Sequence, residues 1–343
     1  MPYHKLILLP LKIIIITNFM TFLYETNILN QPSEWRRVID IPLPSRLSDL
    51  DFKRIYFIGI GSSFWAAKIA EFLWREYVQM DAIAIQSYDF VNSRYFVSPN
   101  DIVVVFSHRG TKTFSVRALE MAKRHYHAYT VLITGLQSPI SINTDFRIET
   151  CPQENCGAFT ISLTSAIVRV LQWIDLFSNG LIDRFRIWLE SVRLPFIIQK
   201  LPKFHNKLII VGDLIREAVA HEVALKISET SYLPARSYGI EQILHGPKVT
   251  LDNESSIITF TSSSQDRQDS LRKYASAVGT ELIEINDAQK QLFSSSSEEF
   301  NWLAQLVWGQ QLALELAKRV GTNPDTVRKD QVLYANAGKD ISL

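Results

Sequence analysis

Four residues in the second half of the chain have side chains that suit proton transfer. Glu222, Lys226 and Glu229 recur at helical spacing, and His245 follows sixteen positions after Glu229, directly before Gly246-Pro247. A carboxylate can remove a proton next to a carbonyl group, and an imidazole can shuttle a hydroxyl proton near neutral pH. An ion pair within a helix and a structural histidine are the alternatives. We expect a turn, and not a helix, to hold His245.

Two segments rich in glycine and hydroxyl groups could bind an anion. Residues 59–63, GIGSS, precede a helix expected to begin near Trp65, and residues 107–113, SHRGTKT, precede another. Cations at a helix N-terminus oppose the helix dipole unless an anion joins them, so the second segment is the stronger candidate. Ordinary capped helix starts are the alternative. The candidate ligand-binding residues are Gly61, Ser62, Ser63, Ser107, His108, Arg109, Gly110, Thr111 and Lys112, with Thr160 and Ser162 as ligand contacts or helix caps.

Buried strands are expected to position these segments. Continuous apolar runs alternate with helical segments twice along the chain, at 55–58, 102–106 and 130–134 and again at 208–211, 256–260 and 281–285. This pattern predicts parallel sheets covered on both faces and a structural duplication. Ligands bind such sheets outside the carboxyl ends of the strands, where both candidate segments fall.

The composition argues against several classes of partner. Lysine and arginine number 36 and acidic residues 35, so the basic excess expected for binding nucleic acid or an anionic membrane is missing. Cys151 and Cys156 lack a metal-binding pattern, which indicates no structural zinc and a reducing, cytoplasmic location. Residues 1–19 contain a short apolar run interrupted by Pro10 and Lys12, which we interpret as an N-terminal extension.

Three motifs together resemble the sugar isomerase (SIS) family, and in particular the isomerase half of the glutamine:fructose-6-phosphate amidotransferases. They are residues 59–63, residues 107–113 and residues 222–247, EVALKISETSYLPARSYGIEQILHGP, and the resemblance runs from about Glu34 to the C-terminus. It implies an α/β fold with two tandem SIS domains, each a parallel doubly wound (flavodoxin-like) sheet flanked by helices. The expected boundaries are 20–190 for the first domain and 191–343 for the second domain and its tail.

The resemblance also implies roles for the candidate residues. Ser63, Ser107 and the loop 108–113 would hold a phosphate, and Glu229 would move a proton between C1 and C2 of a hexose or hexosamine 6-phosphate. Lys226 matches the family motif, and His245 would open the sugar ring from a second subunit, so a homodimer is expected. No metal or redox cofactor is implied. The expected activity is that of an aldose–ketose isomerase or an amino-sugar-phosphate deaminase, and the alternative is a non-catalytic sugar-phosphate sensor.

The chain departs from the family pattern at three places. His108, Arg109 and Lys112 replace Gln, Ser and Thr of the usual phosphate loop, which adds positive charge. Residues 1–33 leave no room for a glutamine-hydrolysing domain, so we do not expect one in this sequence. In the tail, Val332 occupies the position of the family's imine-forming lysine, and Lys339 is the only later lysine, so Lys339 is the candidate for that role.

Overall fold

The structure is a computed structural model in which residues 21–139, 142–192, 194, 198, 200–203, 206–262, 266–287 and 297–341 are described. The N-terminal extension interpreted for residues 1–19 lies outside this part of the chain.

The first half of the chain forms a five-stranded parallel sheet in the order β2-β1-β3-β4-β5. The central strands carry continuous apolar runs because helices cover both of their faces, and every residue of β3 is buried. The strands are β1 (Arg54–Gly59), β2 (Asp81–Gln86), β3 (Ile102–Phe106), β4 (Tyr129–Thr134) and β5 (Phe146–Glu149).

The second half forms a four-stranded parallel sheet in the order β7-β6-β8-β9, which repeats the order of the first four strands of the first sheet. All six strands predicted from apolar runs are present. The sequence pattern missed β2, β5 and β7, which are edge strands with partly exposed residues. The strands of this sheet are β6 (Leu208–Gly212), β7 (Ala235–Gly239), β8 (Ser256–Thr261) and β9 (Glu281–Asn286).

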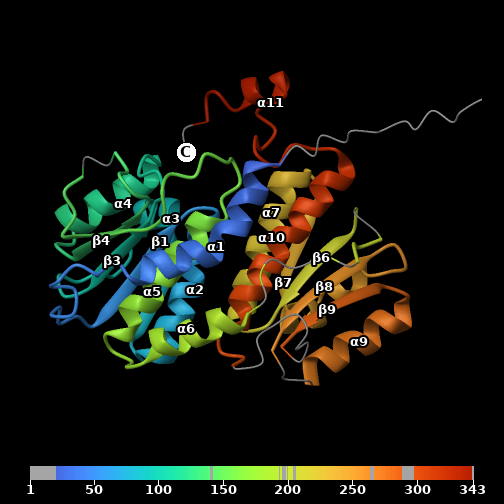
Figure 1. Ribbon diagram of the computed structural model, residues 1–343, viewed down its shortest axis with the longest axis horizontal. Coiled ribbons are helices and arrows are strands. Elements are labelled where there is room, and N and C mark those ends of the chain that lie inside the picture. The colour runs from blue at the N-terminus through green and yellow to red at the C-terminus, as the bar shows by residue number, and fades with distance from the viewer. Residues whose placement is uncertain are drawn as a thin grey trace, which may run out of the picture.

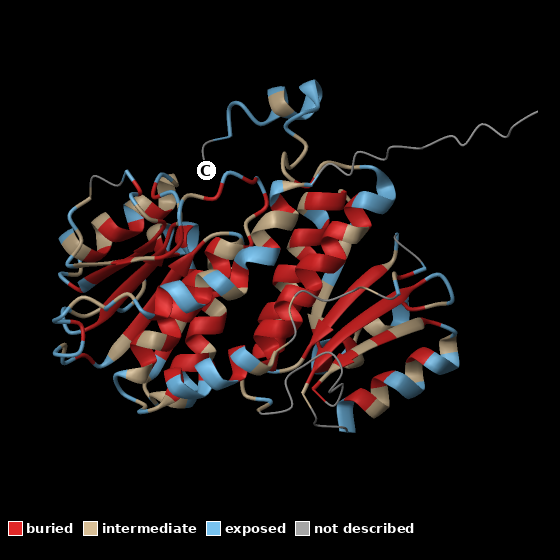
Figure 2. Ribbon diagram, viewed as in Figure 1, coloured by how far each residue is buried: buried red, intermediate tan, exposed pale blue. Residues whose placement is uncertain are grey.

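A layer of helices lies between the two sheets, and Figure 1 shows α1, α2, α5, α7 and α10 side by side there. These helices are largely buried (Figure 2), and Gly309 of α10 lets that helix approach Val223 of α7 closely. The helices are α1 (Leu23–Ile39), α2 (Ser62–Tyr77), α3 (Ser87–Asn92), α4 (Thr113–Arg124), α5 (Ile161–Asp175), α6 (Leu181–Ser191), α7 (Ile215–Ser231), α8 (Ile240–His245), α9 (Asp266–Val278), α10 (Asn301–Val320) and α11 (Val332–Ala337), with a 3-10 turn at Pro247–Thr250.

One local expectation was wrong. His245 is the last residue of the short helix α8 and is not held by an isolated turn. Gly246 is the C-cap of that helix and Pro247 begins the 3-10 turn, so the Gly-Pro pair terminates a helix here.

None of the helices in the described ranges is long and apolar enough to cross a lipid bilayer.

Candidate active site

A pocket of about 590 Å³ lies at the carboxyl ends of β1 and β3. Its walls come from the N-terminus of α2, the loop after β3, the loop at 155–159, one face of α7 and the tail segment 325–330. The structure therefore brings together residues that are far apart in the sequence, and we call this space the central pocket. The predicted site residues that line it are Gly61, Ser62, Ser63, Ser107, His108, Arg109, Lys112, Lys226 and Glu229.

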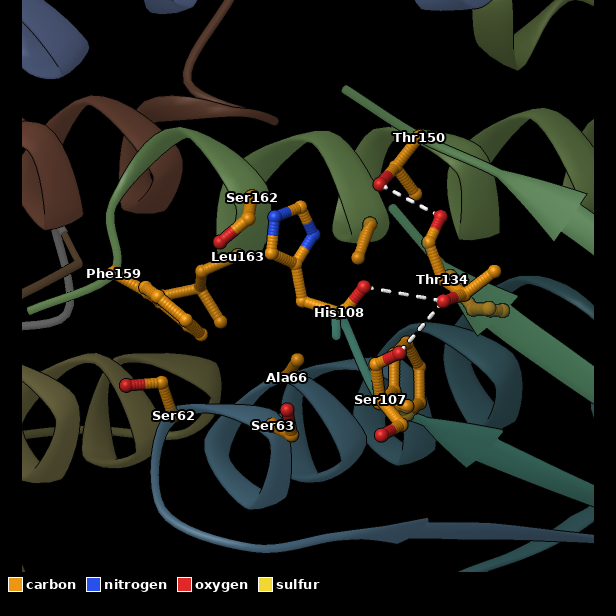
Figure 3. Close-up of a pocket in the computed structure, with 13 residues that line it drawn as sticks. Ser62, Ser63, Ala66, Ser107, His108, Thr134, Thr150, Phe159, Ser162 and Leu163 are labelled. Carbon is orange, nitrogen blue, oxygen red and sulfur yellow. Dashed lines mark hydrogen bonds between the residues drawn. The ribbon is translucent and has the colours of Figure 1, made fainter. Parts of the chain in front are cut away.

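The floor of the central pocket continues into an inner space of about 20 Å³, large enough for one water-sized molecule. Figure 3 shows Ser62, Ser63 and Ser107 around this space. The Ser107 side chain is buried and its hydroxyl has no hydrogen-bond partner in the part of the chain described, although the Ser107 carbonyl accepts a 2.8 Å bond from the Thr134 hydroxyl. A buried, unpaired hydroxyl at a pocket wall is ready to bind a ligand oxygen.

His108 is a neutral member of the pocket wall. Its Nε2 accepts a 2.9 Å bond from the Glu154 amide, so the ring hydrogen of the neutral side chain belongs on Nδ1. The ring fits only because residue 135 is glycine, since a Cβ there would lie 2.6 Å from the ring. Burial, with a smaller contribution from Arg109, lowers the pKa of His108 to about 4. His108 therefore brings no charge to the pocket wall at neutral pH, and its Nδ1 is buried without a hydrogen-bond partner among the described residues.

The low pKa of His108 predicts an acid-sensitive fold. Between about pH 6.5 and 4 the unfolded chain binds a proton at this position and the folded chain does not, so stability falls as the pH falls, by up to about 3 kcal/mol. His108→Gln should remove this pH-dependent part of the free energy of unfolding. The check is urea unfolding of both proteins across this range, and identical pH slopes for the two would contradict the assignment.

Two cations of the same loop stand at the mouth of the central pocket. Arg109 is exposed, lies over the Phe159 ring with 5.0 Å between guanidinium carbon and ring centroid, and donates a 3.3 Å bond to the Glu154 carbonyl. Lys112 is half-buried, and burial together with the charges of Lys329 and Arg109 lowers its pKa. Neither side chain has a carboxylate partner among the described residues, so both remain available to an anion.

The two remaining residues of this loop do not line the pocket. Gly110 is buried with a positive φ of 70°, which supports the turn, and Thr111 is exposed. Their predicted ligand contacts remain untested expectations.

Thr160 and Ser162 hold a buried carboxylate. Glu154 accepts bonds from the hydroxyls of Thr160 at 3.1 Å and Ser162 at 2.6 Å and from both backbone amides. Thr160 is the N-cap residue of α5, yet its hydroxyl bonds to Glu154 and not to the helix. Only Ser162 reaches the inner space, so this pair chiefly fixes the loop that carries Phe159.

Three charged side chains on α7 form a row of ion pairs that runs from the protein interior to the central pocket. Lys226 lies 3.4 Å from Glu222 and forms a shorter ion pair with Glu229. Burial raises the pKa of Glu222 to about 7 even though Lys226 opposes this, whereas the two carboxylates more than offset burial and raise the pKa of Lys226. Lys226 and Glu229 both line the pocket, and Glu229 is the more exposed of the two, with 27% of its side chain exposed. This arrangement offers a carboxylate base that a fixed cation orients.

The tail crosses the mouth of the central pocket at residues 325–330. Asp325 accepts bonds from the amides of Leu23 at 2.9 Å and Tyr24 at 2.7 Å, which fixes the tail to the start of α1. The segment brings Lys329 to the pocket, a residue that the sequence analysis did not select. Lys339 is exposed beyond α11 and does not line the pocket.

His245 lies outside the central pocket. It lines a separate pocket of about 360 Å³ together with Glu241, Lys248 and Tyr274, and its side chain is exposed. Within one chain the structure therefore does not bring His245 to Glu229.

The two cysteines are not suited to act as nucleophiles or proton-transfer groups in the central pocket. Cys151 and Cys156 are free and buried, and burial is the main cause that raises the pKa of each to about 12. No group of three or more His, Cys, Asp or Glu side chains that could hold a metal ion occurs among the described residues.

Comparison with known proteins found a matching family model and distant relatives in sequence. The SIS domain family model matches residues 50–174. A curated glutamine–fructose-6-phosphate aminotransferase (isomerizing) from Aquifex aeolicus is 26% identical over 235 residues, which cover 63% of this chain and 38% of that protein. The match thus spans less than half the length of that relative.

Solved structures share the fold. The C-terminal domain of glucosamine-fructose-6-phosphate aminotransferase from Francisella tularensis superposes with a TM-score of 0.76 at 18% identity, covering 89% of this chain and 98% of that one. A glucosamine-6-phosphate deaminase from Thermotoga maritima gives a TM-score of 0.69 at 20% identity, covering 89% and 97%. At these identities the likeness is one of architecture.

Proposed function

Because residues 50–174 form a SIS domain, we propose that this chain binds a hexose or hexosamine 6-phosphate in the central pocket and moves a proton between C1 and C2. One observation carries the proposal: Glu229 lines the same space as Ser107, Arg109 and Lys112, so a base and an anion cradle face one ligand. The volume of about 590 Å³ lies within the usual range of small-molecule sites.

The phosphate end of the ligand belongs at the N-termini of α2 and α4. Both helices lack acidic residues in their first turn, so their unpaired amides and positive dipole ends favour an anion. Ser63 and Ser107 supply hydroxyls, and Arg109 and Lys112 supply charge. A dianionic phosphate would also relieve the repulsion between these two cations.

The reacting end of the sugar belongs next to Glu229. A proton on a carbon beside a carbonyl group is acidic enough for a carboxylate to remove, and returning it to the neighbouring carbon interconverts aldose and ketose. Lys226 holds Glu229 in place through their ion pair. Lys226 is thus a positioning residue, and Glu229 is the proposed catalytic base.

We assign ring opening to His245 of a second copy of the chain. His245 is exposed and remote from the central pocket of its own chain, which is the position expected of a group that serves a partner. The proposed active unit is therefore a homodimer.

The tail favours a simple aldose–ketose isomerase over a deaminase. Imine chemistry needs a lysine near the sugar carbonyl. Lys339 does not line the central pocket, and Lys329, the tail lysine that does, acts on Lys112 of the phosphate loop. Isomerisation needs only the base and the ring opener. A sugar-phosphate sensor would use the same pocket without proton transfer, and the exchange measurement that closes the Discussion separates the two.

The second sheet supports the proposal of a tandem SIS arrangement. Its strand order repeats that of β2-β1-β3-β4, which is the signature of a duplicated unit. We propose domains at 20–190 and 191–343, with the catalytic base contributed by the second and the phosphate cradle by the first.

Replacing Arg109 by alanine tests the cradle. Loss of a charge-assisted hydrogen bond should weaken binding of the best-binding hexose 6-phosphate about 10- to 100-fold and leave the unphosphorylated sugar unaffected. Isothermal titration calorimetry measures both. Arg117→Ala is the matched control, since Arg117 also lies over a phenylalanine ring, Phe114, but outside the pocket. An equal loss for both sugars, or an equal effect of Arg117→Ala, would refute the cradle.

A further inference from the structure

The tail turns sharply just before Lys329. Val327 and Arg328 have positive φ values of 48° and 64°, which are unfavourable for residues with side chains. The Arg328 amide donates a 2.9 Å bond to the Tyr232 hydroxyl, and its guanidinium lies over the Tyr232 ring at 4.8 Å. An unfavourable backbone conformation that several contacts hold in place indicates that the direction of the following residue matters.

The start of the same segment is fixed to the first half of the chain. The Asp325 carboxylate binds the first amides of α1, and the Asp325 carbonyl accepts a 2.7 Å bond from the Gly157 amide. Val327 then packs so closely on Gly157 that a Cβ at position 157 would lie 2.3 Å from its Cγ2. The tail thus bridges both halves of the chain, and Lys329 is held at the pocket mouth.

Lys329 lines the central pocket together with the loop cations Arg109 and Lys112. At Lys112, the charge of Lys329 lowers the pKa more than that of Arg109 does, although Arg109 belongs to the same loop as Lys112. At Lys226, beside Glu229, the dominant charges are carboxylates and Lys329 is not among them. The charge of Lys329 therefore acts on Lys112 of the anion cradle.

The acidic residues of the pocket form no ion pair with Arg109, Lys112 or Lys329 among the described residues. Asp325 is occupied by the amides of α1, and Glu229 is paired with Lys226. Asp330 is exposed at the rim and accepts a bond from the Thr326 hydroxyl at 2.9 Å. Across the described ranges, Arg109, Lys112 and Lys329 line the pocket without an ion-pair partner, so each is free to pair with an anion.

We propose that Lys329 is a third cation of the phosphate site, supplied by the tail, and that it makes the site selective for a dianionic phosphate. The inference rests on the proposed function, because it assumes that the phosphate lies at the loop 107–112. Two loop cations suffice to bind a monoanion. A phosphate monoester carries nearly two negative charges at neutral pH, and a third cation would interact favourably with the second negative charge.

Fructose 6-phosphate and fructose 6-sulfate are matched probes for this selectivity. Both groups are tetrahedral with three terminal oxygens, but the sulfate ester keeps a single negative charge. At pH 8 and low salt we expect the wild-type protein to bind the phosphate at least ~10-fold more tightly by calorimetry, as one charge-assisted contact would give.

Lys329→Gln should reduce this preference to about twofold or less, mainly by weakening the phosphate probe, as expected when one charge-assisted contact is lost. Lys273→Gln, which removes an exposed lysine on α9, should leave both affinities unchanged. The proposal is overturned if Lys329→Gln has no more effect than Lys273→Gln, or weakens both probes equally. Reductive trapping of the sugar carbonyl on Lys329 by borohydride would also overturn it.

Binding of unphosphorylated fructose as tightly as of fructose 6-phosphate by the wild-type protein would instead overturn the phosphate site itself. A phosphate preference that survives Lys329→Gln would leave the proposed function intact and remove only the role of the tail.

Discussion

Glu229→Gln should slow deuterium incorporation at C2 of the bound sugar phosphate by more than ~100-fold, because glutamine keeps the shape of the side chain but cannot accept the proton. The phosphate cradle belongs to other elements, so the affinity for the ligand should stay within about threefold of wild type, as expected for a group that acts mainly in the transition state. Exchange followed by NMR in deuterated water and calorimetry measure the two quantities.

Glu217→Gln is the matched control for this substitution. Glu217 lies on the same helix, with 46% of its side chain exposed, and does not line the central pocket. The control should exchange protons at the wild-type rate. Equal losses of rate and affinity in Glu229→Gln would assign Glu229 to binding and refute its role as the base.

Lys226→Met should be the most destabilising of the single substitutions considered, with an expected loss of about 3–5 kcal/mol in the free energy of unfolding. The Lys226 side chain is 1% exposed and the Glu222 side chain 0%, so removing the lysine leaves the Glu222 carboxylate buried without a cation partner. Guanidinium unfolding at neutral pH measures the loss. Acidification to below the raised pKa of Glu222 should recover part of the stability, because the carboxyl group is then neutral.

The double variant Glu222→Leu/Lys226→Met separates this effect from a simple packing defect. Replacing a buried pair by apolar side chains of similar size is often neutral, so the double variant should regain most of the stability lost by Lys226→Met. Glu229 can tolerate the loss of its partner because it faces the pocket. A double variant as unstable as the single one would show that the ion pair is not the cause.

Apolar runs predicted the central strands because burial on both faces demands them. Residues 102–106 are apolar at every position, and β3 occupies those positions. The edge strand β7 has the sequence ARSYG with only Gly239 buried, so no apolar run marks it. Edge strands tolerate polar residues, so apolar runs find an edge strand such as β9, which keeps one, and miss β2, β5 and β7.

The helical spacing of Glu222, Lys226 and Glu229 predicted their shared face, because three and four residues separate neighbours on one side of a helix. His245 shows the limit of such patterns: Gly-Pro ends a helix as readily as it marks a turn, so the pair did not reveal that α8 precedes it. Lys329 could not be found at all. Its approach depends on positive φ at Val327 and Arg328, and neither residue is the glycine that would signal such a turn.

The central claim is that the central pocket binds a sugar phosphate and moves its C2 proton. The most direct test incubates the wild-type protein in deuterated water with each hexose or hexosamine 6-phosphate that stabilises it thermally, and follows C2 of each aldose and C1 of each ketose by NMR. The proposed function predicts deuterium at that carbon with at least one binder. Stabilisation without any deuterium uptake would contradict an enzyme and indicate a sugar-phosphate sensor.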